Sequence, residues 1–396
     1  MLEGLKVVEF ATYVAGPSAA AVMSDWGADV IKIESGRGDP TRRSFANQPH
    51  LEGNPVFEWE NHGKRGVVLD IAKGAGKAAL LRLLEGADVF LTNVRPASLR
   101  RNGLDYESLK ARLPRLIYVS VTGYGLEGPG AELPAFDIAA FWSRAGVGGA
   151  MTAKGHEPQL LRPGMGDAVC AISTVSATLA AVIERQQTGR GRLVESSLIR
   201  AGTYAIGWDL SIQLKWDRLG SQRTRKDVFN PIQNYFLTQD GRWVGVFPRD
   251  GRDDFAHIIE VLDMQHLADD ERFATHRARV KNTPELVEAL DEGFARLTLK
   301  EVGERLTKAD LVWGPLNYPR DTVKDELALA AGCFAEIEDA DGVRYRQPTP
   351  PVRFPGYDDR PRRPAPKLGQ HTREVLSEAG YAEAEIEALI ADGAAG

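Results

Sequence analysis

The sequence contains little of what marks several protein classes. Its 396 residues include two cysteines, Cys170 and Cys333, too few for a disulfide framework or a cysteine-rich zinc site. We therefore expect a reducing compartment and a cytoplasmic location. The formal net charge is −6, whereas nucleic-acid binders are normally basic, so we expect no nucleic-acid partner.

Long hydrophobic runs are also scarce. The longest, Ala168 to Ile183, is shorter than the roughly 20 residues of a membrane span and carries Ser and Thr, so we expect a buried helix and no membrane partner. Met1 leads directly into a strand-like run, which does not resemble a signal peptide.

Three catalytic or cofactor signatures are missing. No Gly-x-Ser-x-Gly elbow is present, which argues against a serine hydrolase. None of the seven histidines lies in the loops 122–137 or 162–167, and we expect no metal site. Only Gly16 precedes the first expected helix, so the three-glycine dinucleotide fingerprint is absent, although Glu34 ends the next strand as a ribose-binding acid would.

What the sequence does contain is an alternation of strand and helix signals. Because strands separated by helices imply a parallel sheet, residues 1–205 are predicted to form an α/β domain. Its expected strands are Leu5–Phe10, Val30–Ile33, Gly66–Asp70, Val89–Leu91 and Leu116–Val121, with helices at Pro17–Trp26 and Gly76–Leu84.

The pattern changes after residue 205. A hairpin around Asp240-Gly241 and short helical segments predict a smaller domain over residues 206–330. In the last segment, 331–396, residues 348–366 form a connector rich in Pro and Arg, and two helices close the chain, Thr372–Ala379 and Glu383–Ala391.

The most informative stretch is Arg162 to Asp167, which leads into the long apolar helix. An Asp at a helix start is stabilised as a carboxylate by free backbone N–H groups and the helix dipole, so we expect Asp167 to stay ionised. Such a residue is either a helix cap or a carboxylate nucleophile. The glycines of this stretch and of the loop 122–129 allow a ligand to approach closely.

Basic residues gather near the ends of the early strands and are candidates for a polyphosphate site, because guanidinium groups bind phosphate in a forked geometry. They are Arg37, Arg42, Arg43, Lys64, Arg65, Arg95, Arg100 and Arg101.

Read together, these pieces resemble the class III CoA-transferase family, the CaiB/BaiF group, over essentially the whole chain. The resemblance lies in the order of many short motifs. They are Ala15-Gly16-Pro17, Gly27 to Glu34, Asn61 to Gly66, Asn93 to Pro96, Thr122 to Gly125, Gly166-Asp167, Thr188 to Gly191, Asn230-Pro231 and Gly369 to Thr372.

The resemblance implies a Rossmann-like large domain built from both chain ends, a smaller α+β domain between them, and an interlocked homodimer. It implies acyl-CoA and a small carboxylic acid as substrates, with no permanently bound cofactor. Asp167 would be the nucleophile. The CoA-contacting residues would be Thr12, Tyr13, Val14 and Ala15 at the thiol end, Asn93, Val94 and Arg101 at the nucleotide with Leu69 and Lys73 nearby, and Phe136 by the pantetheine arm.

The chain departs from family patterns at three places. Formyl-CoA transferase-like members carry Gln where this chain has Val14, and a Gly-rich lid that is missing between Leu219 and Gly251, which argues against oxalate or formate. The lid is expected at Arg223 to Asn230 instead. Racemases of the family carry a His where this chain has Phe136, so the alternative of an α-methylacyl-CoA racemase or isomerase lacks one acid–base group.

For the transferase reading we expect Asp167 to form a mixed anhydride with the donor acyl group. Backbone N–H groups must stabilise the oxyanion of each tetrahedral intermediate, and the loops Gly123–Gly125 and Gly164–Gly166 are the expected donors. Tyr13, Phe141 and Trp142 predict room for an acyl group larger than formate.

Overall fold

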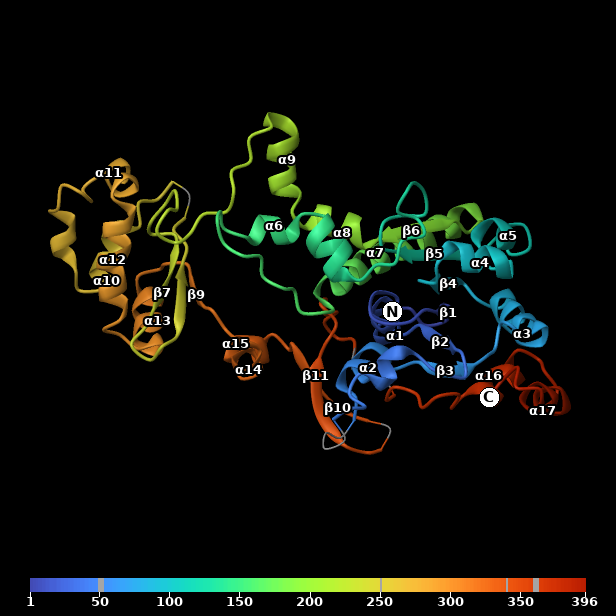
Figure 1. The fold of residues 1–396 in the computed structure, drawn as a ribbon. Helices are drawn as coiled ribbons and strands as arrows, with labels where there is room; N and C mark the ends of the chain where they lie inside the picture. Colours follow the sequence, from blue (N-terminus) through green and yellow to red (C-terminus); the bar gives the residue numbers. More distant parts are fainter. Residues whose placement is uncertain (49–52, 250, 340, 359–362) are drawn as a thin grey trace. The chain divides into compact units, whose positions relative to one another are not determined.

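Six strands form one fully parallel sheet in the computed structural model, which describes residues 1–48, 53–249, 251–339, 341–358 and 363–396. Their order across the sheet is β3-β2-β1-β4-β5-β6, the order of doubly wound nucleotide-binding folds (Figure 1). This confirms the predicted α/β class with a central parallel sheet. The strands are β1 (Lys6–Phe10), β2 (Asp29–Glu34), β3 (Arg65–Val68), β4 (Val89–Thr92), β5 (Ile117–Thr122) and β6 (Leu193–Ser197).

Helices cover both faces of this sheet because successive strand residues point to opposite sides. Val7 packs under helices α1 (Ala15–Asp25) and α7 (Met165–Thr188), while Val8 belongs to the core on the other face. That second face is covered by α3 (Gly74–Glu85), α4 (Pro96–Asn102), α5 (Tyr106–Lys110), α16 (Thr372–Glu378) and α17 (Glu383–Ala391).

Helix α7 contains the apolar run singled out in the sequence. Among the helices that the structure describes, it alone has a length and composition that would also suit a membrane crossing. It lies against α1, β5 and β6, and Ala171 and Val175 are buried in the core between them. Its packing is that of a core helix in an α/β layer.

The chain divides into two units. One comprises residues 1–149, 158–219 and 330–396, and the other residues 150–157 and 220–329. Residue 219 ends the middle segment of the first unit, so α9 (Gly207–Trp216) belongs to that unit. At the β3 edge, Gly66 N–H donates to the His371 ring and His371 N–H donates to Gly66 O, so the Gly369–Thr372 motif seals an otherwise open strand.

Several further elements of the chain accompany the sheet and its helices. They are η1 (Pro40–Arg43), α2 (Pro55–Asn61), the π-helix η2 (Ile138–Arg144), α6 (Val147–Met151), α8 (Leu198–Ala205), β10 (Phe334–Glu338) and β11 (Arg344–Pro348). The antiparallel β10–β11 hairpin was not predicted. Residues 359–362 of the expected Pro- and Arg-rich connector lie outside the described residues.

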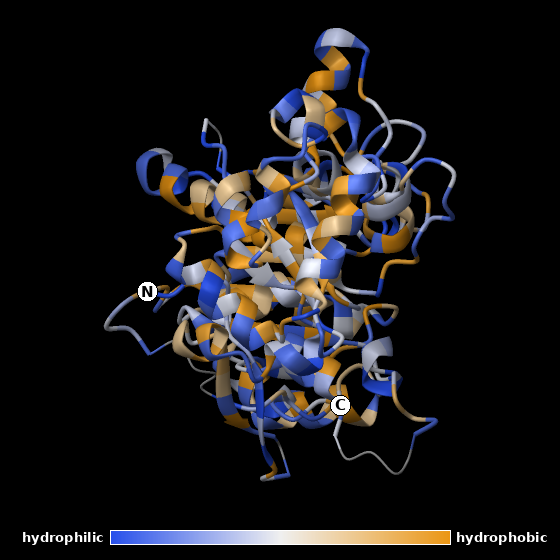
Figure 2. Cartoon of the chain, turned by 90° about the vertical axis from the view of Figure 1, so that its left-hand side faces the viewer, coloured by the Kyte–Doolittle hydropathy of each residue, from blue (hydrophilic) through white to orange (hydrophobic). Residues whose placement is uncertain are grey.

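The second unit is a small sheet packed against helices. Its predicted hairpin is confirmed as the antiparallel pair β7 (Asn234–Leu237) and β8 (Trp243–Val246), which β9 (Trp313–Pro315) extends. Figure 2 colours the chain by hydropathy, with hydrophobic residues in orange; in this unit the buried apolar residues, among them Phe236, Val244 and Phe294, form one core. The helices are α10 (Phe255–Val261), η3 (Gln265–Ala268), α11 (His276–Lys281), α12 (Thr283–Phe294), α13 (Leu299–Lys308), α14 (Pro319–Thr322) and α15 (Glu326–Ala330).

Candidate active site

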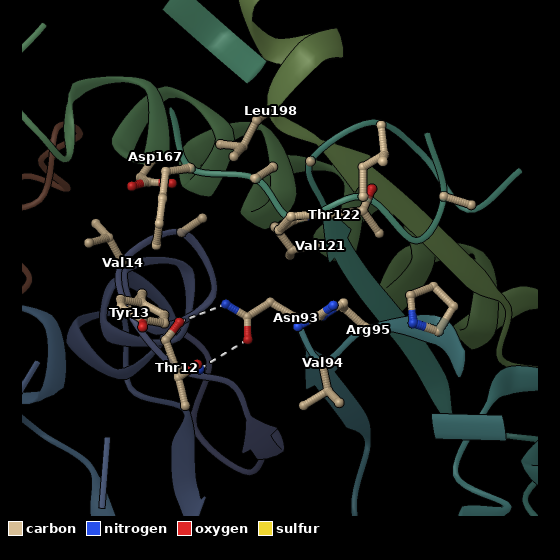
Figure 3. Close-up of a pocket in the computed structure, with 18 residues that line it drawn as sticks. Thr12, Tyr13, Val14, Asn93, Val94, Arg95, Val121, Thr122, Asp167 and Leu198 are labelled. Carbon is tan, nitrogen blue, oxygen red and sulfur yellow. Dashed lines mark hydrogen bonds between the residues drawn. The ribbon is translucent and has the colours of Figure 1, made fainter. Parts of the chain in front are cut away.

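A cavity of about 400 Å³ opens where β1, β4 and β5 end (Figure 3). The strand order reverses between β1 and β4, and open parallel sheets bind ligands at such a point, outside the carboxyl ends of the strands. The lining residues are Thr12, Tyr13, Val14, Ala15, Asn93, Val94, Arg95, Pro96, Val121, Thr122, Gly123, Ala131, Leu133, Pro134, Ala135, Phe136, Asp167 and Leu198.

The loop between β1 and α1 forms one wall of this cavity. The Asn93 side chain accepts from Thr12 N–H at 3.0 Å and donates to Thr12 O at 2.6 Å, which ties the loop to the end of β4 (Figure 3). Tyr13 then adopts a φ of 64°, in the left-handed region that non-glycine residues rarely visit. Its ring meets Phe136 edge-to-face, with ring centroids 5.4 Å apart.

Asp167 lies in the first turn of α7 and does not cap the helix. Gly164, which has no side chain of its own, holds the N-cap position with a φ of 99°. Burial raises the pKa of Asp167 to about 7, and the nearby Asp137 carboxylate adds to the rise. The expectation that the helix terminus keeps Asp167 ionised throughout the neutral range is therefore wrong, because desolvation and a like charge outweigh the dipole.

Asp137 is the residue that the sequence analysis missed. It is buried, and its Oδ2 accepts from Gly164 N–H at 2.9 Å and from Gly166 N–H at 3.1 Å. Two of the amides expected to hold an oxyanion at Gly164–Gly166 are thus already occupied by Asp137. In the other glycine loop, Gly125 N–H donates to Thr122 Oγ1.

The start of α1 offers other backbone donors. Val14 is its N-cap residue, and no side chain caps this end. The first amides of a helix have no partner within it, and Ala15 lines the cavity. This helix end therefore presents polarised N–H groups beside the site.

Most of the remaining predicted contact residues lie in or beside the cavity. Arg101 lines a neighbouring depression of about 390 Å³, and Val94 and Arg95 line both hollows. Leu69 and Lys73 lie elsewhere. Leu69 is buried and its backbone bridges to Ala395, while Lys73 Nζ donates to the backbone oxygen of Asp392.

The basic residues near the ends of the early strands differ in their partners. Some are internal ion-pair partners: Arg42 binds Glu34, Lys64 binds Glu9, and Arg65 binds Asp29, Glu374 and Glu378. Arg95 and Arg101, in contrast, have no acidic partner in the described part of the chain and line the hollows. No group of three potential metal ligands occurs among the residues that the structure describes.

Comparison with known proteins gives a consistent result. Residues 2–372 match the model of CoA-transferase family III. The chain is 32% identical over 390 residues to the (R)-2-hydroxy-4-methylpentanoate CoA-transferase of Clostridioides difficile, covering 98% of this chain and 97% of that one. It is 31% identical over 402 residues to the cinnamoyl-CoA:phenyllactate CoA-transferase of Clostridium sporogenes, covering 99% and 96%. A CAIB/BAIF family protein from Brucella suis superimposes with a TM-score of 0.85 at 31% identity, covering 96% of this chain and 99% of that one.

Proposed function

The chain belongs to CoA-transferase family III and is an enzyme of that class, and we propose that it moves CoA from an acyl-CoA donor to a free carboxylic acid with Asp167 as nucleophile. One observation carries the assignment of the residue. Asp167 places a carboxylate, not engaged as a helix cap, in the wall of the cavity at the reversal point of the sheet.

The proposed cycle has four displacements. Asp167 attacks the thioester carbonyl of the donor, and the C–S bond breaks to give an aspartyl–acyl anhydride and CoA thiolate. The thiolate attacks the aspartyl carbonyl and releases the donor acid. The acceptor carboxylate attacks the resulting aspartyl thioester, which forms a second anhydride and frees the thiolate again. Attack of the thiolate on the acceptor acyl carbon then yields the new acyl-CoA and restores Asp167.

The raised pKa of Asp167 suits this role. An ordinary aspartate, with a pKa near 3.9, is a weak nucleophile against a thiolate leaving group whose acid has a pKa near 8.5. A pKa of about 7 narrows that gap while leaving a large ionised fraction at neutral pH. We propose that the N–H groups at the start of α1 donate hydrogen bonds to the oxyanion, because the Gly164 and Gly166 amides already donate to Asp137.

The two hollows suit different parts of acyl-CoA. Arg95 and Arg101, which have no acidic partner in the described chain, would hold phosphate groups of the nucleotide. The remaining wall of the larger cavity is mostly apolar, with Val14, Phe136 and Leu198 among its residues.

For the acid we propose a branched or aromatic monocarboxylate. Apolar walls favour an apolar acyl group, and the names of two similar enzymes, from C. difficile and C. sporogenes, contain the acids 2-hydroxy-4-methylpentanoate and phenyllactate.

We also propose that the enzyme is a homodimer, interlocked as in its family, and cytoplasmic. Four large apolar side chains on α8 and α9 are more than 60% exposed, a concentration typical of an interaction surface: Tyr204, Trp208, Leu214 and Trp216. Light scattering should give a mass of two chains. Cys170 and Cys333 are free thiols, which suits a reducing compartment.

The test is an incubation in D₂O with panels of acyl-CoAs and free acids, read by mass spectrometry, for wild type and for Asp167→Ala. New acyl-CoA species without deuterium, lost at least about a thousandfold in the variant, would support the proposal. Recovered acyl-CoA carrying one deuterium would instead indicate racemase chemistry. Transfer by Asp167→Ala at the wild-type rate would exclude Asp167 as nucleophile.

A further inference from the structure

A buried ion network lies at the ends of β1 and β2, outside the residues that line the cavity. The Lys32 ammonium contacts Glu9 at 2.9 Å and Asp39 at 3.0 Å, and the Lys64 ammonium contacts Glu9 at 2.6 Å. All four side chains are fully buried. Lys32 also donates to the backbone oxygen of Ala11, the first residue of the β1–α1 loop, at 3.1 Å.

Asp39 connects this network to the cavity wall. Its Oδ2 accepts from Lys32, and its Oδ1 accepts from Tyr13 N–H at 3.2 Å. Thr41 donates to the same Oδ1 through its N–H at 3.0 Å and its hydroxyl at 2.8 Å. Although burial opposes it, the Lys32 charge and the Thr41 hydrogen bonds hold the pKa of Asp39 below its usual value. Asp39 therefore stays a carboxylate and a strong acceptor.

The backbone that Asp39 holds is an unusual one. Tyr13 has a φ of 64° although it is not glycine, and such a conformation persists only where the surroundings impose it. Asn93 fixes Thr12 on one side through two hydrogen bonds, and Asp39 fixes the next amide. Figure 3 shows the consequence: Val14 follows Tyr13 and lies between it and Asp167.

We propose that Asp39, which touches neither the cavity nor the reacting atoms, is a positioning residue for CoA transfer: through the Tyr13 amide it imposes the left-handed backbone that sets the cavity wall facing Asp167 and the start of α1. This inference rests on the proposed function for its catalytic meaning. Lys32 serves the same end by keeping Asp39 charged and aimed.

Glycine provides the test, because it adopts a left-handed backbone without help. Tyr13→Gly and Tyr13→Ala both remove the ring, and they differ in their need for an imposed conformation. We would measure kcat and KM for both variants, each with and without Asp39→Ala, which removes the acceptor for Tyr13 N–H. With Asp39 present, we expect their kcat values to agree within about threefold. With Asp39→Ala, the Tyr13→Gly enzyme should exceed the Tyr13→Ala enzyme in kcat by about tenfold or more.

An equal kcat ratio in both backgrounds would overturn the proposal, because a general loss of stability would affect the two variants alike. Asp270→Ala is the matched control: Asp270 pairs with Arg272 at 2.7 Å in the other unit, and its replacement should leave the ratio unchanged.

A second measurement needs no variant to fold. Amide hydrogen exchange of the wild type should show Tyr13 N–H protected at least about a hundredfold relative to an unstructured peptide. Exchange at the unprotected rate would refute the clamp directly. Because this readout does not depend on turnover, it separates failure of the clamp from failure of the wild type to transfer CoA, which would refute the proposed function instead.

Discussion

Replacing Asp137 by asparagine should make the enzyme active at lower pH. Burial raises the pKa of Asp167 from 3.8 to about 7, and the charge of Asp137 is the second cause. The rise corresponds to about 4 kcal/mol of unfavourable charging free energy. Asparagine removes the like charge and keeps an oxygen acceptor. We therefore expect the charging free energy to become smaller and the pKa of Asp167 to fall by about 1.

The pKa of Asp167 determines how kcat/KM should vary with pH. If the carboxylate form reacts, about one tenth of wild-type Asp167 is competent at pH 6, and kcat/KM should rise about tenfold between pH 6 and pH 8. A pKa near 6 would make about half of the Asp137→Asn enzyme competent at pH 6, so its activity there should be about five times larger relative to its own plateau.

The assay is kcat/KM for one donor–acceptor pair from pH 5.5 to 8.5, because this parameter reports the ionisation of the free enzyme. Acceptor carboxylates stay ionised throughout that range. Asp137→Ala serves as the control, since it leaves the Gly164 and Gly166 amides unpaired and should lower activity at every pH. A wild-type profile that is flat, or a midpoint that does not move in Asp137→Asn, would refute the reasoning.

Two further changes test other parts of the molecule. Arg101→Ala should raise KM for acyl-CoA about tenfold with kcat nearly unchanged in initial-rate kinetics. Lys73→Ala should alter neither parameter, because the Lys73 ammonium donates to the backbone oxygen of Asp392. The opposite pair of results would reverse the assignment of the nucleotide site. Glu60 is buried, and burial raises its pKa to about 8 from 4.5. The native state then keeps a proton that the unfolded state loses, so stability should fall as pH rises from about 4.5 to 8. Glu60→Gln should remove this slope and exceed the stability of the wild type by about 5 kcal/mol at pH 9 in urea unfolding, and parallel curves would contradict the burial argument.

The sheet could be predicted because its strands are buried on both faces and read as apolar runs. Strands β1 to β5 were found in this way. β6 was missed because Glu195 and the two serines after it interrupt its apolar pattern, even though the strand pairs with β5 throughout. Its place is imposed by the partner strand, which a local pattern does not contain.

The site likewise contains residues that the sequence predicts and residues that it does not. Thr12 to Ala15 and Asn93 to Val94 follow strand ends, and parallel topology brings strand ends together whatever the loops contain. Asp137 and Asp39 act through hydrogen bonds to Gly164, Gly166 and Tyr13, amides that are remote in sequence, so no local spacing marks them. The Gly38-Asp39-Pro40 turn was the only local signal at Asp39, and it reads equally well as a plain helix cap.

The contacts of Asp167 bear on whether it is a helix cap or, as we propose, a nucleophile. A capping aspartate accepts backbone N–H groups, and these bonds lower its pKa. At the start of α7 the N–H groups of Gly164 and Gly166 go to Asp137, which leaves Asp167 without them and beside a like charge. This arrangement destabilises the carboxylate form of Asp167. A destabilised carboxylate is more basic and therefore a better nucleophile toward a thioester. The hydrogen bonds that make Asp167 a poor helix cap are therefore the same ones that suit it to attack acyl-CoA.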